Sequence, residues 1–303
     1  GKYGLNNIEK NEKVLDDSIY RIWSMTKPFI SIVALQLISE NKISLEDPIT
    51  EYLPEFNDLR VMIKEDGNIN DVEKIEQFPT IKDLLLHTAG FSYNFLDDLI
   101  GEEYHNVGLF YSNENTLEDE IKILSKVPLL YEPGTRWVYS VSIDILARII
   151  EVVENNSLQD VLKKRIFQPL EMHNTGFSLN KDQQKKLVKS YHYETPANRL
   201  VSPDVNPRYI SNYGYPVQSE SFARGGIGLY STPEDYLSFA NMLHTGLSKK
   251  GERIISFDML ELATQNQISQ SFLPFEIKNF DINQLDENVF ESYGWGYGFR
   301  VNM

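Results

Sequence analysis

A serine hydroxyl and a lysine amine stand three residues apart in the run Ser24-Met25-Thr26-Lys27. On a helix, positions i and i+3 lie on the same face, so the two side chains would be neighbours. A serine hydroxyl is a poor nucleophile until a base takes its proton, and a lysine in a partly desolvated pocket can lose its own proton near neutral pH. The pair therefore predicts acyl transfer, with Ser24 as nucleophile and Lys27 as its activator.

The Ser-x-x-Lys spacing alone does not select this pair, because the chain contains it three times, beginning at Ser24, Ser39 and Ser178. Ser39 falls at the polar end of a predicted helix, and Ser178 falls in a polar loop, so both are expected at the solvated surface. A strongly apolar helical pattern follows Ser24 at once. A serine at a helix start also lies where backbone N–H groups and the positive end of the helix dipole stabilise an oxyanion. This context favours Ser24.

A phenol is the second group that this chemistry would use, as a proton shuttle with Lys27. Two tyrosines, Tyr104 and Tyr111, stand in a literal Tyr-x-Asn pattern, but both lie in a polar stretch. Tyr139 instead stands between a Pro-Gly loop and a strongly periodic helix, which is a rigid place to hold a catalytic group. Tyr139 is therefore the candidate for the shuttle by its position, although by residue type alone a tyrosine there is more often a packed aromatic residue.

Metal and cofactor chemistry have no support in the sequence. No two of the five histidines are three or four residues apart, so a zinc site is not expected. His87 and His244 each precede a Thr and a nearby Gly and are interpreted as helix stops. Cysteine is absent, which excludes thiol catalysis, cysteine-ligated zinc and disulfides. There is no glycine-rich phosphate loop, and we predict no cofactor and no metal.

The composition and net charge of the chain limit the kinds of binding partner that are expected. The 303 residues are 41% hydrophobic and 12% aromatic, as in an ordinary globular protein, and the net charge is −15. That charge repels a phosphate backbone, so nucleic-acid binding is not expected. The longest apolar stretch, residues 28–38, is too short and too interrupted to cross a membrane. A small-molecule ester, amide or peptide is the expected partner.

Apolar periodicity predicts the elements that would position these residues. A helix is expected over 25–41, with one apolar stripe formed by Ile30, Val33, Ala34, Leu37 and Ile38. Further helices are expected over 80–86 (ending near Gly90), 113–127 and 142–153, and from Pro233 onward. Alternating aromatic residues and glycines over 293–301 predict one strand. Residues 180–222 are expected to form a long loop without regular secondary structure.

The order of these predicted helices and strands along the chain indicates two structural regions. A sheet domain is expected from residues 1–58 with 225–303, and a mostly helical region with long loops from residues 59–224. Gly1 follows no initiator methionine, and Met303 falls in what looks like a strand, so both ends are interpreted as cut.

Several ordered segments resemble the serine beta-lactamase-related family, which includes class C beta-lactamases, D-alanyl-D-alanine carboxypeptidases and the esterases called family VIII. The matching runs span nearly the whole chain; they are residues 21–29, 43–49, 52–56, 84–91, 133–140, 225–232, 235–236 and 294–301. The resemblance implies an α+β fold of the beta-lactamase/transpeptidase type, with an antiparallel sheet flanked by helices and an inserted helical region. It also implies Ser24 as acyl-accepting nucleophile, Lys27 as activator and Tyr139 as proton shuttle.

Two departures from the family pattern shape the functional prediction. Val141 stands where the family often has the Asn of Tyr-x-Asn, which removes an amide that would bind substrate. The family's third motif (Lys/His-Thr-Gly or Trp-Gly-Gly) would lie beyond Met303, so the C-terminal strands are expected to be missing, and neither His87 nor His244 is taken as a substitute.

We therefore expect an esterase-like serine hydrolase that forms an acyl-enzyme at Ser24. The alternatives are a D-Ala-D-Ala carboxypeptidase, a beta-lactamase, or a penicillin-binding or sensor-type protein with little turnover. The compartment, bacterial cytoplasm or periplasm, and the oligomeric state stay open at this point.

Overall fold

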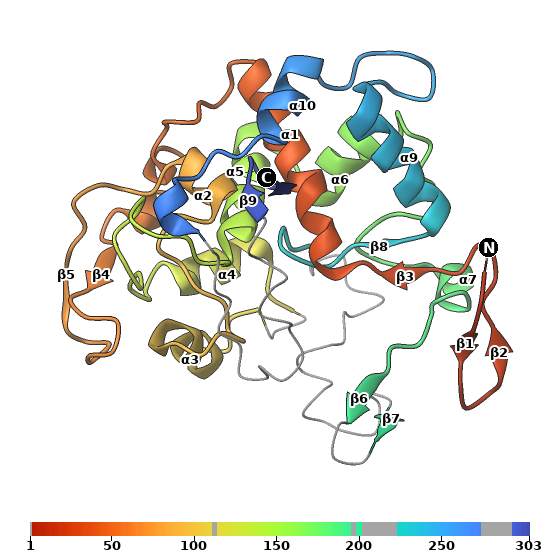
Figure 1. The fold of residues 1–303 in the computed structure, drawn as a ribbon, viewed down its shortest axis with the longest axis horizontal. Coiled ribbons are helices and arrows are strands. Elements are labelled where there is room, and N and C mark those ends of the chain that lie inside the picture. The colour runs from red at the N-terminus through yellow and green to blue at the C-terminus, as the bar shows by residue number, and fades with distance from the viewer. Residues whose placement is uncertain (1, 111–113, 195–197, 202–222, 274–292) are drawn as a thin grey trace.

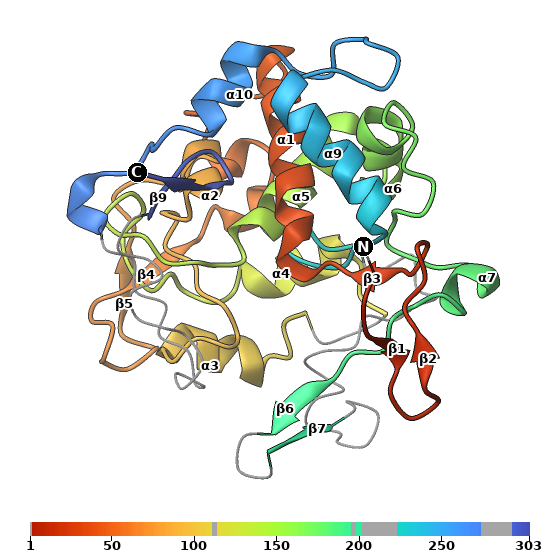
Figure 2. The ribbon, with the colours of Figure 1, turned by 45° about the vertical axis from the view of Figure 1, so that its right-hand side comes forward.

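A central helical layer organises the fold (Figure 1). The computed structural model describes residues 2–110, 114–194, 198–201, 223–273 and 293–303. Helix α1 (Lys27–Ser39) packs against α5 (Ser142–Glu154), and α5 also contacts α2 (Ile81–Leu86). Figures 1 and 2 place α9 (Pro233–Thr245) beside α1, so α1 has helical neighbours on more than one side.

The other helices that the structure describes are short and surround this layer. The α-helices are α3 (Leu99–Asn106), α4 (Leu117–Leu124), α6 (Leu158–Leu162), α7 (Lys181–Gln184) and α10 (Phe257–Ala263). The 3₁₀ turns are η1 (Trp23–Thr26), η2 (Ile49–Glu51), η3 (Pro54–Phe56) and η6 (Gln270–Phe272), and η4 (Lys163–Phe167) is a π turn.

Helix α1 is buried almost all round, and the prediction of a single apolar face was wrong. Ile30 and Val33 of the predicted stripe are fully buried, but so are Phe29 and Ile32 outside it. The reason is the second layer of helices, since the Phe29 ring stacks on Phe239 of α9 with centroids 3.9 Å apart. The helix also begins later than predicted, because a 3₁₀ turn precedes it.

Local capping explains where other helices begin and end. The side chain of Thr80 accepts the Asp83 N–H and so caps α2, and Thr232 caps α9 in the same way ahead of Pro233. Gly246 ends α9 in the left-handed conformation, as the sequence predicts. Helix α2 ends earlier than the expected Gly90, because His87 already turns into the left-handed conformation with φ 57°.

Every strand pair that the structure describes is antiparallel and two-stranded. The pairs are β1 (Leu5–Asn7) with β2 (Glu12–Lys13), β3 (Tyr20–Arg21) with β8 (Tyr230–Ser231), β4 (Arg60–Met62) with β5 (Val72–Lys74), β6 (His192–Glu194) with β7 (Arg199–Val201), and β9 (Tyr293–Trp295) with β10 (Arg300–Asn302). In the β3–β8 pair, Tyr20 lies opposite Ser231, so the segment leading to Ser24 lies beside the segment that follows Gly228. The division into regions 1–58 with 225–303 and 59–224 stays a prediction.

The predicted single strand over 293–301 is instead a hairpin. Trp295 of β9 pairs with Arg300 of β10, and the turn between them contains Gly298 at φ 82°. A side chain at Gly298 would strike the Ser31 hydroxyl of α1, with its Cβ 1.9 Å from Oγ. The alternation of glycine and aromatic residues is typical of a strand. Here, however, Gly298 allows the chain to turn and to approach α1 closely.

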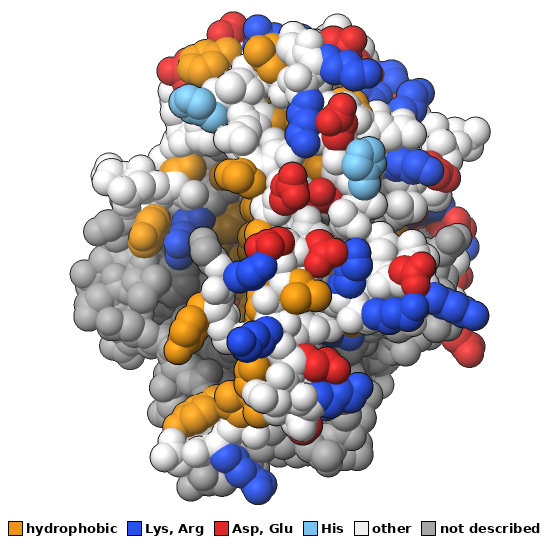
Figure 3. All heavy atoms as spheres, turned by 90° about the vertical axis from the view of Figure 1, so that its right-hand side faces the viewer, with side chains coloured by type: hydrophobic (Ala, Val, Ile, Leu, Met, Phe, Trp, Pro, Cys, Tyr) orange, Lys and Arg blue, Asp and Glu red, His pale blue; other side chains and the backbone are white. Residues whose placement is uncertain are grey.

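Charged side chains of both signs are interspersed on the face shown in Figure 3, with hydrophobic side chains exposed among them. Within the described ranges, no helix combines the length and apolar character that crossing a bilayer requires.

Candidate functional site

Ser24 and Lys27 meet at the entrance to helix α1. Ser24 is exposed within η1, whereas Lys27 begins α1 and is only 4% exposed. The Lys27 Nζ lies 3.2 Å from the Ser24 Oγ and donates a second hydrogen bond, 2.8 Å long, to the Gly226 carbonyl. An exposed hydroxyl therefore stands over a buried amine that is oriented by a backbone carbonyl.

The backbone directly before the hydroxyl is strained. Trp23 has φ 46°, in a region that bulky residues rarely adopt. Strain of this kind persists only where surrounding structure enforces it, and it gathers at functional sites. The next turn is fixed by segment 226–231, because the Ile22 N–H donates to the Leu229 carbonyl and the Leu229 N–H donates to the Thr26 hydroxyl.

Tyr139 comes from a different part of the chain and reaches the same place. It is half-buried in the loop before α5, and the Lys27 Nζ lies 4.7 Å from its ring centroid. Tyr93, which the sequence did not single out, is also close, with the Lys27 Nζ 5.2 Å from its ring centroid. The structure thus brings Ser24, Lys27 and Tyr139 together.

The competing sequence matches lie elsewhere. Ser39 donates to the Leu35 carbonyl at the exposed end of α1, and Lys42 pairs with Glu154. Of the two literal Tyr-x-Asn tyrosines, Tyr104 is fully buried in the core, and burial raises the pKa of its phenol. Tyr111 lies outside the described residues.

A buried carboxylate that sequence reasoning missed completes the surroundings of Lys27. Asp144, in the first turn of α5, is 2% exposed, and its Oδ1 accepts the Gly226 N–H at 2.9 Å. Burial raises the pKa of Asp144, while the nearby charge of Lys27 opposes that shift. Gly226 thus links the two groups, because its N–H binds Asp144 and its carbonyl binds Lys27. The signal available in the sequence was an acidic residue within a helix whose neighbours are apolar.

Only glycine fits at this link. A Cβ on Gly226 would stand 2.4 Å from the Tyr93 hydroxyl oxygen and 2.5 Å from the Asp144 Oδ2. A Cβ on Gly225 would stand 2.2 Å from the Ile143 carbonyl oxygen of α5. The glycine-rich run after Ala223 therefore allows this segment to lie directly against the start of α5.

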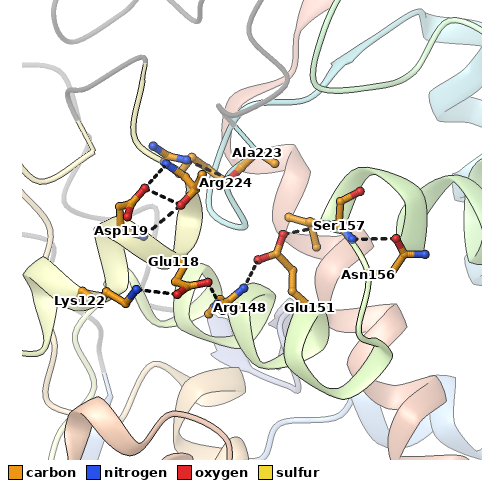
Figure 4. A network of polar contacts seen from close by, with 11 residues as sticks. Glu118, Asp119, Lys122, Arg148, Glu151, Asn156, Ser157, Ala223 and Arg224 are labelled. Carbon is orange, nitrogen blue, oxygen red and sulfur yellow. Dashed lines mark hydrogen bonds and ion pairs between the residues drawn. The ribbon is translucent and has the colours of Figure 1, made fainter.

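A buried ion pair also anchors the glycine-rich segment that contains Gly225 and Gly226. Arg224 and Glu120 are both fully buried and 3.2 Å apart, and the Phe110 N–H also donates to Glu120 at 2.7 Å. Figure 4 shows Arg224 beside helix α4 and, nearby, Arg148 bonded to both Glu118 and Glu151. The Arg224–Glu120 pair thus fastens this segment to α4, and Arg148 joins α4 to α5.

The buried charges of this region alternate and balance. The electrostatic interactions run from Glu120 to Arg224, from Arg224 to Asp144, and from Asp144 to Lys27. Two carboxyl groups therefore alternate with two basic groups, which reduces the cost of burying each of them. Within the described ranges, no three His, Asp or Glu side chains gather closely enough to hold a metal ion.

Comparison with known proteins identifies chains that are similar to this one. Residues 1–301 match the family model described as Beta-lactamase. Protein Rv1367c of Mycobacterium tuberculosis (strain ATCC 25618 / H37Rv) is 30% identical over 92% of this chain and 69% of its own length. Esterase EstB of Burkholderia gladioli is 26% identical over 77% of this chain and 59% of its own length, so the chain spans little more than half of that relative.

The fold also matches solved structures. "EstCE1, a hydrolase with promiscuous acyltransferase activity" superposes with a TM-score of 0.75 at 23% identity, over 99% of this chain and 73% of the other. The α+β fold of the beta-lactamase/transpeptidase type, predicted from the resemblance, is confirmed. The chain belongs to the beta-lactamase family.

Proposed function

We propose that this protein is a serine hydrolase that forms an acyl-enzyme at Ser24 from a small ester. The observation that carries the proposal is the 3.2 Å contact between the exposed Ser24 hydroxyl and the buried Lys27 amine, with the Tyr139 ring beside that amine. A hydroxyl of this kind attacks a carbonyl once its proton has a base to go to.

In the proposed first step, the Ser24 Oγ bonds to the carbonyl carbon of the ester and its proton passes to neutral Lys27. Tyr139 then relays a proton to the leaving alcohol as the ester C–O bond breaks, which leaves the acyl group on Ser24. In the second step, water attacks the acyl-enzyme, the carboxylic acid leaves, and Ser24 regains its proton. An alcohol in place of water would give acyl transfer, and EstCE1 is described as a hydrolase with promiscuous activity of that kind.

An ester is favoured over a beta-lactam or a D-Ala-D-Ala peptide because of Val141. Its side chain is 1% exposed and belongs to the hydrophobic core, and its N–H donates to the Ser92 carbonyl at 3.1 Å. A buried valine offers no amide to a substrate. The name of the relative esterase EstB supports the same ranking.

Three chromogenic or coupled assays test this ranking. We expect turnover of short-chain p-nitrophenyl esters to exceed turnover of a D-Ala-D-Ala peptide and of a chromogenic cephalosporin, and an added short alcohol to divert part of the product into a new ester. Faster turnover of the cephalosporin than of every ester would contradict the proposal. Inactivity on all three substrates would favour a sensor-type protein.

Asp144→Asn is expected to lower kcat/KM for an ester about tenfold, which corresponds to ~1.4 kcal/mol of transition-state stabilisation. Asparagine keeps an oxygen for the Gly226 N–H but loses the negative charge that stabilises Lys27 once it has accepted the proton. Steady-state kinetics and a thermal melt on the same samples measure the effect.

The matched control for this prediction is Asp182→Asn. Asp182 is 85% exposed and pairs with Lys185 on α7. We expect that variant to keep the wild-type rate. An Asp144→Asn protein with unchanged kcat/KM would show that this carboxylate does not support Lys27 in the reaction.

A further inference from the structure

His87 holds the backbone on both sides of Tyr139. The Val138 N–H donates to the His87 carbonyl at 3.0 Å, and the Ser140 N–H donates to the His87 Nδ1 at 3.1 Å. The imidazole also packs against the Tyr139 ring, with centroids 4.7 Å apart and planes inclined by 36°. The residue before Tyr139, the residue after it and its own ring therefore all contact one side chain or its backbone.

The hydrogen bond from Ser140 fixes the protonation state of this histidine. A backbone N–H can only donate, so the His87 Nδ1 must carry a lone pair, and in a neutral ring the proton is on Nε2. The ring is fully buried, and burial, followed by the charge of Lys27, lowers the pKa of His87 well below its ordinary value. The neutral form is the one that this position accommodates.

Packing holds the ring in that orientation. Trp137 and Trp295 lie across it in edge-to-face arrangements, with centroids 6.3 and 5.2 Å from the imidazole. Trp295 is itself fixed, because its indole N–H donates to the Leu85 carbonyl at 3.1 Å. Among the described residues the His87 Nε2 has no hydrogen-bond partner, so the two polar contacts of Nδ1, with the Ser140 N–H and with the Ser140 Oγ 3.2 Å away, set how the ring faces the loop.

Ending helix α2 does not require a histidine. That role needs only a residue that adopts the left-handed conformation, which glycine and asparagine do most readily. The Nδ1 acceptor and the ring contact with Tyr139 are additional features that a helix stop does not use. The two roles can therefore be separated by substitution.

We infer that His87 is a positioning residue for Tyr139, which as a neutral Nδ1 acceptor fixes the loop that presents the phenol beside Lys27. The inference rests on the proposed function, in which Tyr139 moves a proton. A phenol displaced by about 1 Å from a reacting group can cost on the order of 100-fold in rate. His87 itself touches no reacting atom in this mechanism.

Two variants that both tolerate the left-handed turn test the inference. H87G removes the acceptor and the ring, while H87N keeps an oxygen close to the position of Nδ1. We expect H87G to lower kcat for a p-nitrophenyl ester about 10- to 100-fold with KM changed less than about threefold. We expect H87N to recover most of that loss.

A double-mutant cycle with Tyr139→Phe separates positioning from general support of the fold. If His87 acts through the phenol, H87G should change the residual rate of Tyr139→Phe less than about threefold. An equal loss from H87G in both backgrounds, or equal losses from H87N and H87G, would overturn the inference. These results stay distinct from failure of the proposed function, which would appear as full activity in Ser24→Ala.

A direct measurement covers the case in which H87G does not melt cooperatively. In ¹⁵N-resolved histidine-ring NMR spectra of the wild-type protein, assigned through H87N, His87 should show an unprotonated Nδ1 and a protonated Nε2. A protonated Nδ1 would contradict the hydrogen bond from Ser140 and with it the positioning role.

Discussion

Ser24→Ala is expected to reduce ester hydrolysis by at least about 10⁴-fold, to a level near the uncatalysed background. The loss is large because alanine has no atom to carry the acyl group, so the two-step path disappears. The fold should be unaffected, since the Ser24 side chain is exposed and its hydroxyl bonds to the Lys27 amine. Steady-state rates with a p-nitrophenyl ester measure the loss of activity, and the melting temperature shows whether the fold is unchanged.

Helix α1, which follows Ser24 in the chain, supplies a control for this prediction. Ser39 begins the second Ser-x-x-Lys match, is exposed, and donates to the Leu35 carbonyl. Ser39→Ala should therefore keep the wild-type rate. A Ser24→Ala protein that retained more than a few per cent of the rate would show that another group carries the acyl chain.

Lys27→Met is expected to lower kcat/KM about 10²- to 10⁴-fold, the range that a positioned general base contributes. Methionine has nearly the shape of lysine without its terminal amine, so the buried site stays filled while the proton acceptor is lost. The Gly226 carbonyl also loses its hydrogen bond from Nζ. Pre-steady-state measurement of acyl-enzyme formation locates the loss in the first chemical step.

Lys42→Met is the matched substitution for Lys27→Met. Lys42 lies at the exposed end of α1, where it pairs with Glu40 and Glu154. Surface ion pairs contribute little, so both rate and stability should change only slightly. Equal rates in Lys27→Met and Lys42→Met would remove Lys27 from the mechanism.

The parts of the fold and site that the sequence predicts are those with local signals. Thr232, Pro233 and Gly246 bound α9 by interactions within a few residues, so pattern reasoning finds both ends. Ser24 and Lys27 stand one helical turn apart, so their proximity also follows from local geometry. The approach of Tyr139, more than a hundred residues later, was predicted only through resemblance to the family, whose fold is confirmed.

The features that the sequence does not predict depend on contacts between distant segments. Asp144 matters because Gly226 lies against it, and no local pattern places those two residues together. The β9–β10 hairpin differs from the predicted strand because Gly298 must fit against Ser31 of α1. His87 is both the helix stop that was predicted and a contact of Tyr139 that could not be seen from its neighbours in sequence.

Covalent labelling of the wild-type protein tests the central claim most directly. A fluorophosphonate should add one phosphonyl group, seen by intact-mass spectrometry, and the adduct should map to Ser24 within the tryptic peptide that begins at Ile22. Ser24→Ala should remain unlabelled, and Ser39→Ala should label at the wild-type rate. An adduct on any peptide without Ser24, or no adduct in folded protein, would contradict the assignment of Ser24 as the nucleophile.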